Sequence, residues 1–244
     1  HVLDADRPAG APRRILPRRP GVEYDLDHRG DSFFVVTNDG AHNFKLVEAP
    51  VADPSPARWR ERIAHSEDVL LVGVSAFAGH LVVQLRERGL PALEIHDLKT
   101  GARHRVEQPE PTHDLALAWN PDFSTRTLRF LYSSPVTPPS YIDYDMDTRR
   151  RVVVKQHVVH GHDPAAYVAS RIFATAADGA QVPISLVHRR DLDRSAPRPL
   201  LLDGYGAYGV SADAGFSAAA LSLLDRGFIL ATAQVRGGSE LGRR

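Results

Sequence analysis

Two glycine-rich segments near the end of the chain carry the residues best suited to chemistry. Residues 204–209 read Gly-Tyr-Gly-Ala-Tyr-Gly and follow one short apolar run, and residues 236–240 follow the next. Glycines allow sharp backbone turns, and a phenol held over such a turn can donate a hydrogen bond to negative charge developing on an oxygen. The alternative is a tight loop whose tyrosines merely pack. The Gly-x-x-x-x-Gly-Lys pattern of a phosphate loop is not present.

None of the serines has the sequence context of a hydrolase nucleophile. Such a serine lies in Gly-x-Ser-x-Gly, on a strained turn between a strand and a helix. The residue two positions after Ser239 is Leu241, where the motif requires glycine. Ser75 and Ser211 do not match the motif either. A general base with its orienting acid cannot be identified either. The sequence therefore predicts a chain without a complete catalytic triad.

Three histidines, His157, His160 and His162, are spaced closely enough to suggest metal ligands. The chain has no cysteine, and no carboxylate stands at a fixed spacing from them, so we interpret them as solvated linker residues. We expect neither a metal nor a cofactor. Residues 149–151 are three arginines, which we interpret as a charged strand edge.

The elements around the two glycine segments have the order typical of an α/β sheet. Residues 200–202 form a continuous apolar run, which predicts a strand buried on both faces, and residues 228–233 form another. Between them, residues 217–226 are rich in helix formers and end at Gly227. Upstream, Asp178-Gly179 predicts a type I′ hairpin between strands at 172–177 and 181–188. Both glycine segments then follow carboxyl ends of strands, where such sheets place ligands.

The first part of the chain is rich in short strands. Alternating or β-branched runs predict strands at residues 32–37, 43–47, 69–74, 80–85, 92–98, 127–133, 141–144 and 151–155. The segment that contains Asp97 resembles the one that contains Asp145, and these positions are 48 residues apart (145 − 97). A repeat of about 40–50 residues is typical of a β-propeller blade. About three blades fit, although a two-sheet sandwich is an alternative.

Composition restricts the function and the location. Lys plus Arg and Asp plus Glu both number 30, so no net charge attracts nucleic acid or an anionic membrane. The apolar runs are far shorter than the ~20 residues that span a bilayer, and no signal segment opens the chain. Cysteine is absent, which is compatible with a reducing cytosol. The chain has no initiator Met and stops just past a glycine loop, so we expect it to be a fragment.

Three segments together resemble the prolyl oligopeptidase family of serine peptidases, and in particular its oligopeptidase B branch. They are residues 200–209, 221–228 and 235–238, and residues 21–31 and 37–39 also resemble that family's propeller. The resemblance implies a partial β-propeller of about three C-terminal blades over residues 1–157. It implies the N-terminal part of an α/β-hydrolase domain over residues 158–244. The family cleaves short peptides in the cytoplasm, after Arg or Lys in this branch.

The same resemblance assigns two residues to the site. Tyr205 matches the tyrosine whose hydroxyl forms half of the oxyanion hole. Asp213 matches one of two acidic residues that bind a basic substrate residue, and the second position is Gly215 here, which weakens the expected dibasic preference. Asp203 and Ser239 stand where the family usually has Tyr and Gly. The Ser, Asp and His of the triad would fall beyond Arg244.

We therefore expect a fragment of a serine oligopeptidase that is inactive alone, with peptides containing basic residues as substrates of the parent. The alternative is a non-catalytic propeller module that binds a partner. A downstream Gly-x-Ser-x-Gly would favour the peptidase, and a natural stop after Arg244 would favour the module. The natural substrate and the oligomeric state do not follow from the sequence.

Overall fold

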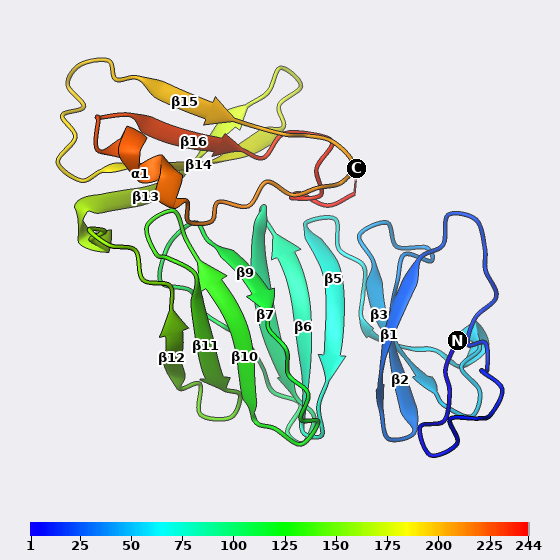
Figure 1. Ribbon diagram of the computed structural model, residues 1–244. Coiled ribbons are helices and arrows are strands. Elements are labelled where there is room, and N and C mark those ends of the chain that lie inside the picture. The colour runs from blue at the N-terminus through cyan, green and yellow to red at the C-terminus, as the bar shows by residue number, and fades with distance from the viewer. Residues whose placement is uncertain (244) are drawn as a thin grey trace.

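The computed structural model describes residues 1–243 and contains four sheets of four strands each (Figure 1). Three of them are antiparallel sheets made from strands that are consecutive in the chain. Sheet 1 contains β1 (Tyr24–Arg29), β2 (Ser32–Thr37), β3 (Lys45–Pro50) and β4 (Arg60–Ile63). Sheet 2 contains β5 (Val69–Ala76), β6 (His80–Glu87), β7 (Leu90–Asp97) and β8 (Arg103–Arg105). Sheet 3 contains β9 (Asp114–Leu117), β10 (Thr127–Ser133), β11 (Ser140–Asp145) and β12 (Arg151–Gln156).

Sheet 4 has a different construction, with the strand order β13-β14-β16-β15. Its strands are β13 (Tyr167–Thr175), β14 (Gln181–Arg189), β15 (Leu200–Asp203) and β16 (Ile229–Ala233), and helix α1 (Ala218–Leu224) connects the last two. β15 and β16 are parallel neighbours, so this unit is the predicted strand-helix-strand. Short 3₁₀ turns, η1 (Pro56–Arg58) and η2 (Pro164–Ala166), complete the elements. None of the helices described here is long and apolar enough to cross a membrane.

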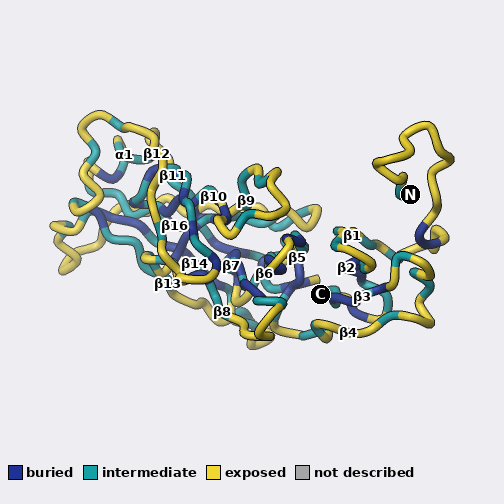
Figure 2. Tube along the Cα trace, turned by 90° about the horizontal axis from the view of Figure 1, so that it is seen from below, coloured by how far each residue is buried: buried dark blue, intermediate teal, exposed yellow. Residues whose placement is uncertain are grey.

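The first three sheets pack face to face, and side chains alternate between their two faces. In β6, Leu81, Val83 and Leu85 belong to the core shared with sheet 1, whereas Val82 belongs to the core shared with sheet 3. Because successive side chains of a strand point to opposite faces, a strand between two cores becomes apolar along its whole length. In Figure 2, dark blue buried stretches lie along β5, β6 and β7, and yellow exposed loops connect the strands.

The internal repeat found in the sequence occupies equivalent positions in two sheets. β7 and β11 are the third strands of sheets 2 and 3, and they end at Asp97 and Asp145. Each aspartate side chain accepts hydrogen bonds from two backbone N–H groups of the following turn. Each turn then closes at a residue with positive φ, Gly101 or Arg149. The repeat therefore encodes one type of turn, in which the aspartate satisfies the backbone donors.

Most expected strands are present within a few residues of their expected bounds, but four short or polar strands were missed: β1, β4, β8 and β9. Arg151 begins the edge strand β12, as the interpretation of a charged strand edge requires, but its guanidinium also lies over Phe130 and Tyr132, 5.6 and 4.9 Å from their ring centroids. The hairpin between β13 and β14 is confirmed, but its turn is not type I′. Gly179 has positive φ and Asp178 does not, since the loop closes over five residues.

The expectation that residues 200–202 are buried on both faces is wrong for the described residues. Leu200, Leu201 and Leu202 are 53%, 50% and 59% exposed. The reason is the strand order, because β15 lies at the edge of sheet 4 and pairs with β16 alone. An apolar edge strand of this kind is a surface on which further chain can pack.

Candidate functional site

The two glycine loops lie side by side, as their positions after neighbouring strands predicted. The loop after β15 contains Gly206, whose φ is +65° and whose added Cβ would lie 2.5 Å from the Arg236 carbonyl oxygen in the loop after β16. The Gly209 N–H donates to the Gly237 carbonyl at 2.9 Å. A Cβ at Gly237 would overlap the Gly206 carbonyl. The loops therefore interlock through backbone, which requires glycine at these points.

Tyr205 lies at the start of the first loop, directly after the end of β15 and Gly204. Its side chain is 58% exposed, and Tyr208 on the same loop is 92% exposed. A Cβ at Gly204 would lie 3.3 Å from the Ala233 carbonyl, so the chain leaves β15 tightly against the end of β16. This contact fixes the backbone of Tyr205 while its phenol stays accessible, which suits a hydrogen-bond donor to a ligand.

The tip of the β6–β7 hairpin is held by residues of the second part of the chain. Gln234, which follows β16, donates to the Gly89 carbonyl at 2.7 Å. Arg171 of β13 donates to the Arg88 carbonyl and, at 3.1 Å, to Gln234 Oε1. Gly89 has a φ of +88°, and a Cβ there would overlap Gln234 Oε1 and lie 2.7 Å from the Arg171 guanidinium. Gln234 and Arg171 can therefore approach the hairpin tip this closely only because residue 89 has no side chain.

Asp213 forms an ion pair with Arg86 of the same hairpin. Both guanidinium Nη atoms donate to the two carboxylate oxygens, at 2.6 and 2.8 Å, and the side chains are 11% and 22% exposed. Bidentate geometry and partial burial make this one of the stronger kinds of ion pair. The family resemblance assigned Asp213 to a site for a substrate cation, and in the structure its carboxylate is paired with a cation of the chain itself, Arg86.

A second carboxylate, which the sequence analysis missed, lies beside this pair. A Cβ at Gly215 would lie 3.7 Å from Asp114 Oδ2 and 3.2 Å from the Ser133 hydroxyl. Burial raises the pKa of Asp114, and the neighbouring Asp213 raises it further. The space beside Gly215 is therefore filled by an acidic side chain from β9. No local pattern reveals this, because the two positions are about 100 residues apart in the sequence.

The segment after β16 contacts both the loop before α1 and sheet 1. Glu240 is buried and its carboxylate accepts from the Ala212 N–H at 2.7 Å, next to Asp213. The Arg243 N–H donates to Asn43 at 2.7 Å, and its guanidinium pairs with Glu23 at 2.6 and 3.0 Å. This pairing lowers the pKa of the Glu23 carboxyl. Sheet 1 and the loop after β16 are thereby joined.

The structure does not bring the three predicted linker histidines together. His162 is partly buried between Tyr167 and Phe216, at 5.4 and 4.9 Å between ring centroids, and its Nε2 bonds to the Val136 carbonyl at 2.8 Å. The interpretation of His162 as a solvated residue is therefore wrong. Within residues 1–243, one cluster has metal-ligand side chains close together, namely His42, His65 and Glu67.

Face-to-face four-stranded antiparallel sheets, taken in chain order, are the construction of a β-propeller. Residues 1–157 match the prolyl oligopeptidase N-terminal β-propeller domain. Since this match covers more than half of the 244 residues, the chain belongs to the prolyl oligopeptidase family.

The known proteins that are similar to the chain include several peptidases. It is 39% identical over 231 residues to dipeptidyl aminopeptidase BI of Pseudoxanthomonas mexicana, covering 94% of this chain and 32% of that protein. Oligopeptidase B from Leishmania major has a similar structure, with a TM-score of 0.84 and 38% identity over 93% of this chain and 33% of that one. Oligopeptidase B from Trypanosoma brucei, in a closed form with covalently bound antipain, has a TM-score of 0.85 and 34% identity. The match covers 93% of this chain and 34% of that one. The chain spans about a third of the length of these proteins.

Replacing Gly89 by Ala should release the hairpin tip. The new methyl group would overlap Gln234, so the tip must move away from β16, in addition to the cost of about 1–2 kcal/mol for a non-glycine residue at positive φ. Gly101→Ala is the matched control, because its φ is +77° and nothing lies within 4 Å of its Cβ position. Urea denaturation should show a larger loss of stability for Gly89→Ala, and equal losses would contradict the contact.

Replacing Asp114 by Asn should change how stability depends on pH. An acid whose pKa is raised on folding binds more protons in the native state, so its contribution to stability falls as the pH rises from about 4 through the folded pKa. Asp114→Asn removes that loss, and the variant should gain stability relative to the parent chain between pH 4 and pH 7. Urea denaturation at both pH values measures the change, with Asp31→Asn as control, because Asp31 is exposed in the turn between β1 and β2. A relative loss would mean that Arg86 dominates the environment of Asp114.

Proposed function

We propose that this chain is part of a serine peptidase that hydrolyses short peptides after Arg or Lys. In this proposal residues 1–157 are about three closing blades of a propeller, and residues 158–244 begin an α/β-hydrolase domain. The observation that carries it is the pair of parallel strands β15 and β16, whose carboxyl ends lead into two interlocked glycine loops with an accessible tyrosine. The family membership supports it. We also place the parent protein in the cytoplasm.

Tyr205 is proposed as an oxyanion-hole donor. During attack on a peptide carbonyl, negative charge develops on the carbonyl oxygen, and a fixed O–H donor stabilises that charge more than it stabilises the neutral substrate. The interlocked loops support this role, because they hold the backbone of Tyr205 while leaving its side chain accessible. The remaining donor, the nucleophile and its base would come from other parts of the longer protein.

Preference for a basic substrate residue is proposed to come from Asp213 together with Asp114. Two carboxylates and one guanidinium, that of Arg86, meet at this point, so negative charge is in excess when both acids are ionised. A substrate cation would compete with Arg86 for Asp213 or pair with Asp114. This pair of acids would offset the absence of an acidic side chain at position 215.

The chain by itself is proposed to be inactive. Its sequence contains no Gly-x-Ser-x-Gly, and nucleophile, base and orienting acid act as a unit, so a chain without them has no covalent route to hydrolysis. The exposed apolar strand β15 is consistent with further chain packing on this edge of sheet 4.

The test compares the 244-residue chain with the complete polypeptide in which it occurs. Each is incubated with a fluorogenic Arg-Arg amide and with a fluorophosphonate probe that labels activated serines. We expect labelling and turnover for the complete polypeptide and neither for the chain alone. Labelling of the chain would show that one of its own serines is a nucleophile. Silence of both proteins would favour a non-catalytic binding module.

Replacing Tyr205 by Phe in the complete polypeptide should lower kcat about 10²- to 10³-fold, equivalent to ~2.7–4 kcal/mol of transition-state stabilisation, with little change in KM. Tyr208→Phe is the matched control, since Tyr208 lies on the same loop and is more exposed. Steady-state kinetics with the Arg-Arg amide measures both variants. Equal kcat values for Tyr205→Phe and the parent enzyme would remove Tyr205 from the oxyanion hole.

A further inference from the structure

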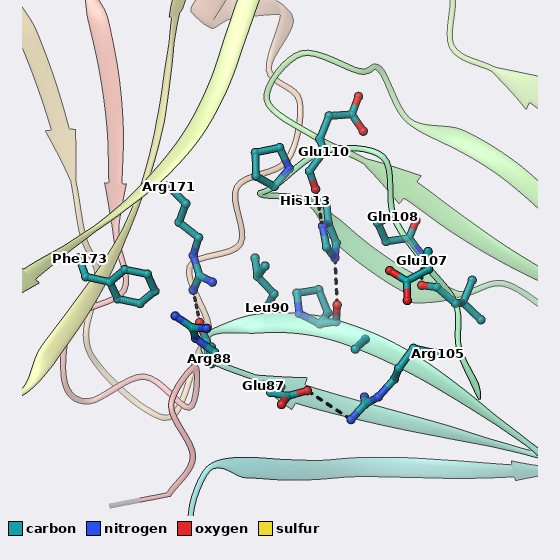
Figure 3. Close-up of a pocket in the computed structure, with 14 residues that line it drawn as sticks. Glu87, Arg88, Leu90, Arg105, Glu107, Gln108, Glu110, His113, Arg171 and Phe173 are labelled. Carbon is teal, nitrogen blue, oxygen red and sulfur yellow. Dashed lines mark hydrogen bonds and ion pairs between the residues drawn. The ribbon is translucent and has the colours of Figure 1, made fainter. Parts of the chain in front are cut away.

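A cavity of about 470 Å³ lies at the boundary between the propeller-type sheets and sheet 4 (Figure 3). Its walls come from the β6–β7 hairpin, the segment between β8 and β9, and β13. Arg88, Arg171 and Phe173 lie together at one end of it, as Figure 3 shows. This end is separate from the Asp213 ion pair, because neither Asp213 nor Arg86 lines the cavity.

The two arginines at this end lie over one aromatic ring, and neither is paired with an acid among the residues described. Their guanidinium carbons lie 5.3 and 5.2 Å from the centroid of Phe173. Neither Arg88 nor Arg171 forms an ion pair with a carboxylate in the described part of the chain. The Nε of Arg171 is buried and has no hydrogen-bond partner among residues 1–243. Such a donor is costly to leave unpaired.

The electrostatic environment of Arg171 favours an anion beside it. Burial lowers the pKa of Arg171 to about 10, and the nearby Arg88 contributes to the lowering. An anion placed between the two groups would relieve both effects, because it attracts each guanidinium and can accept from the unpaired Nε.

The acidic residues of the cavity do not fill this role. Glu87 pairs with Arg105 at 3.2 Å, and Glu110 accepts from the hydroxyls of Tyr132 and Thr137. Glu107 lies beside Arg105, across the cavity from Phe173 (Figure 3). The cavity therefore has one acidic end, where Glu87, Glu107 and Glu110 lie with a single guanidinium, that of Arg105, and one positive end beside Phe173.

We propose that Arg88 and Arg171 form a binding site for a carboxylate group of a peptide, either its C-terminus or an acidic side chain. That the ligand is a peptide rests on the proposed function, whereas the anion site rests on the arginine geometry. The guanidinium fork matches a planar carboxylate, and the Phe173 ring supplies an apolar wall beside it. Gln234 links Arg171 to the Gly89 carbonyl and to the backbone next to Asp213, so the two charged sites share one support.

The test measures binding of short peptides without basic residues to the complete polypeptide by fluorescence anisotropy with an uncharged fluorophore. Gly-Ser-Gly-Asp amide, Gly-Ser-Gly-Asn amide and Gly-Ser-Gly-Asn free acid separate a side-chain carboxylate from a terminal one. We expect at least one carboxylate peptide to bind about tenfold more tightly than the neutral peptide. Arg88→Gln should abolish that difference and leave the neutral peptide unaffected. Arg88 is exposed, so this variant should fold, and Arg171→Gln is the second variant.

Arg226→Gln is the matched control, since Arg226 also lies over an aromatic ring, 5.9 Å from Phe228, but does not line the cavity. Equal affinities of the three peptides for the parent protein would overturn the proposal. So would a fall in melting temperature for Arg88→Gln with no carboxylate preference, because the arginines would then pair with acids elsewhere in the polypeptide. Carboxylate preference without hydrolysis of the Arg-Arg amide would retain this site and refute the proposed peptidase function.

Discussion

The contact of the β6–β7 hairpin tip with Gln234, Arg171 and Asp213 is the interaction on which the positions of the two charged sites depend. Gln234 and Arg171 hold the backbone of residues 88 and 89, and Asp213 holds Arg86. Arg171 belongs to β13, Gln234 follows β16, and Asp213 lies in the loop before α1. One hairpin of sheet 2 therefore contacts three separate segments of the region that contains sheet 4. Because backbone carbonyls are the main acceptors, the contact depends on the path of the chain and on the glycine at position 89.

Charge is distributed unevenly along this boundary. Two carboxylates, Asp213 and Asp114, lie near the single guanidinium of Arg86, whereas Arg88 and Arg171 form no ion pair among the residues described. A boundary stabilised by apolar packing alone would not place unmatched charges in partly buried positions, since each carries a desolvation cost. Under the two proposals above, a bound peptide would meet negative charge near Asp213 and positive charge near Arg171.

The sequence predicted the elements whose signals are local. Strands such as β2 and β10, the helix that ends before Gly227 and the neighbouring glycine loops all follow from alternation, helix formers and turn residues. The short strands β4, β8 and β9 were missed because pairing with a neighbour, more than their own composition, makes them strands. Asp114 and Arg86 were missed for a related reason, since their partners are about 100 residues or more away.

The contact between Arg243 and Asn43 joins residues 200 positions apart, which has a consequence for biosynthesis. The strands of the first three sheets pair with their neighbours in sequence, so each sheet is complete soon after its last strand is made. At about 5–20 residues per second, a ribosome needs roughly 10–40 s to add the residues that separate Asn43 from its partner. During that interval the first three sheets can form and pack while the loop that carries Asn43 waits for a segment not yet translated.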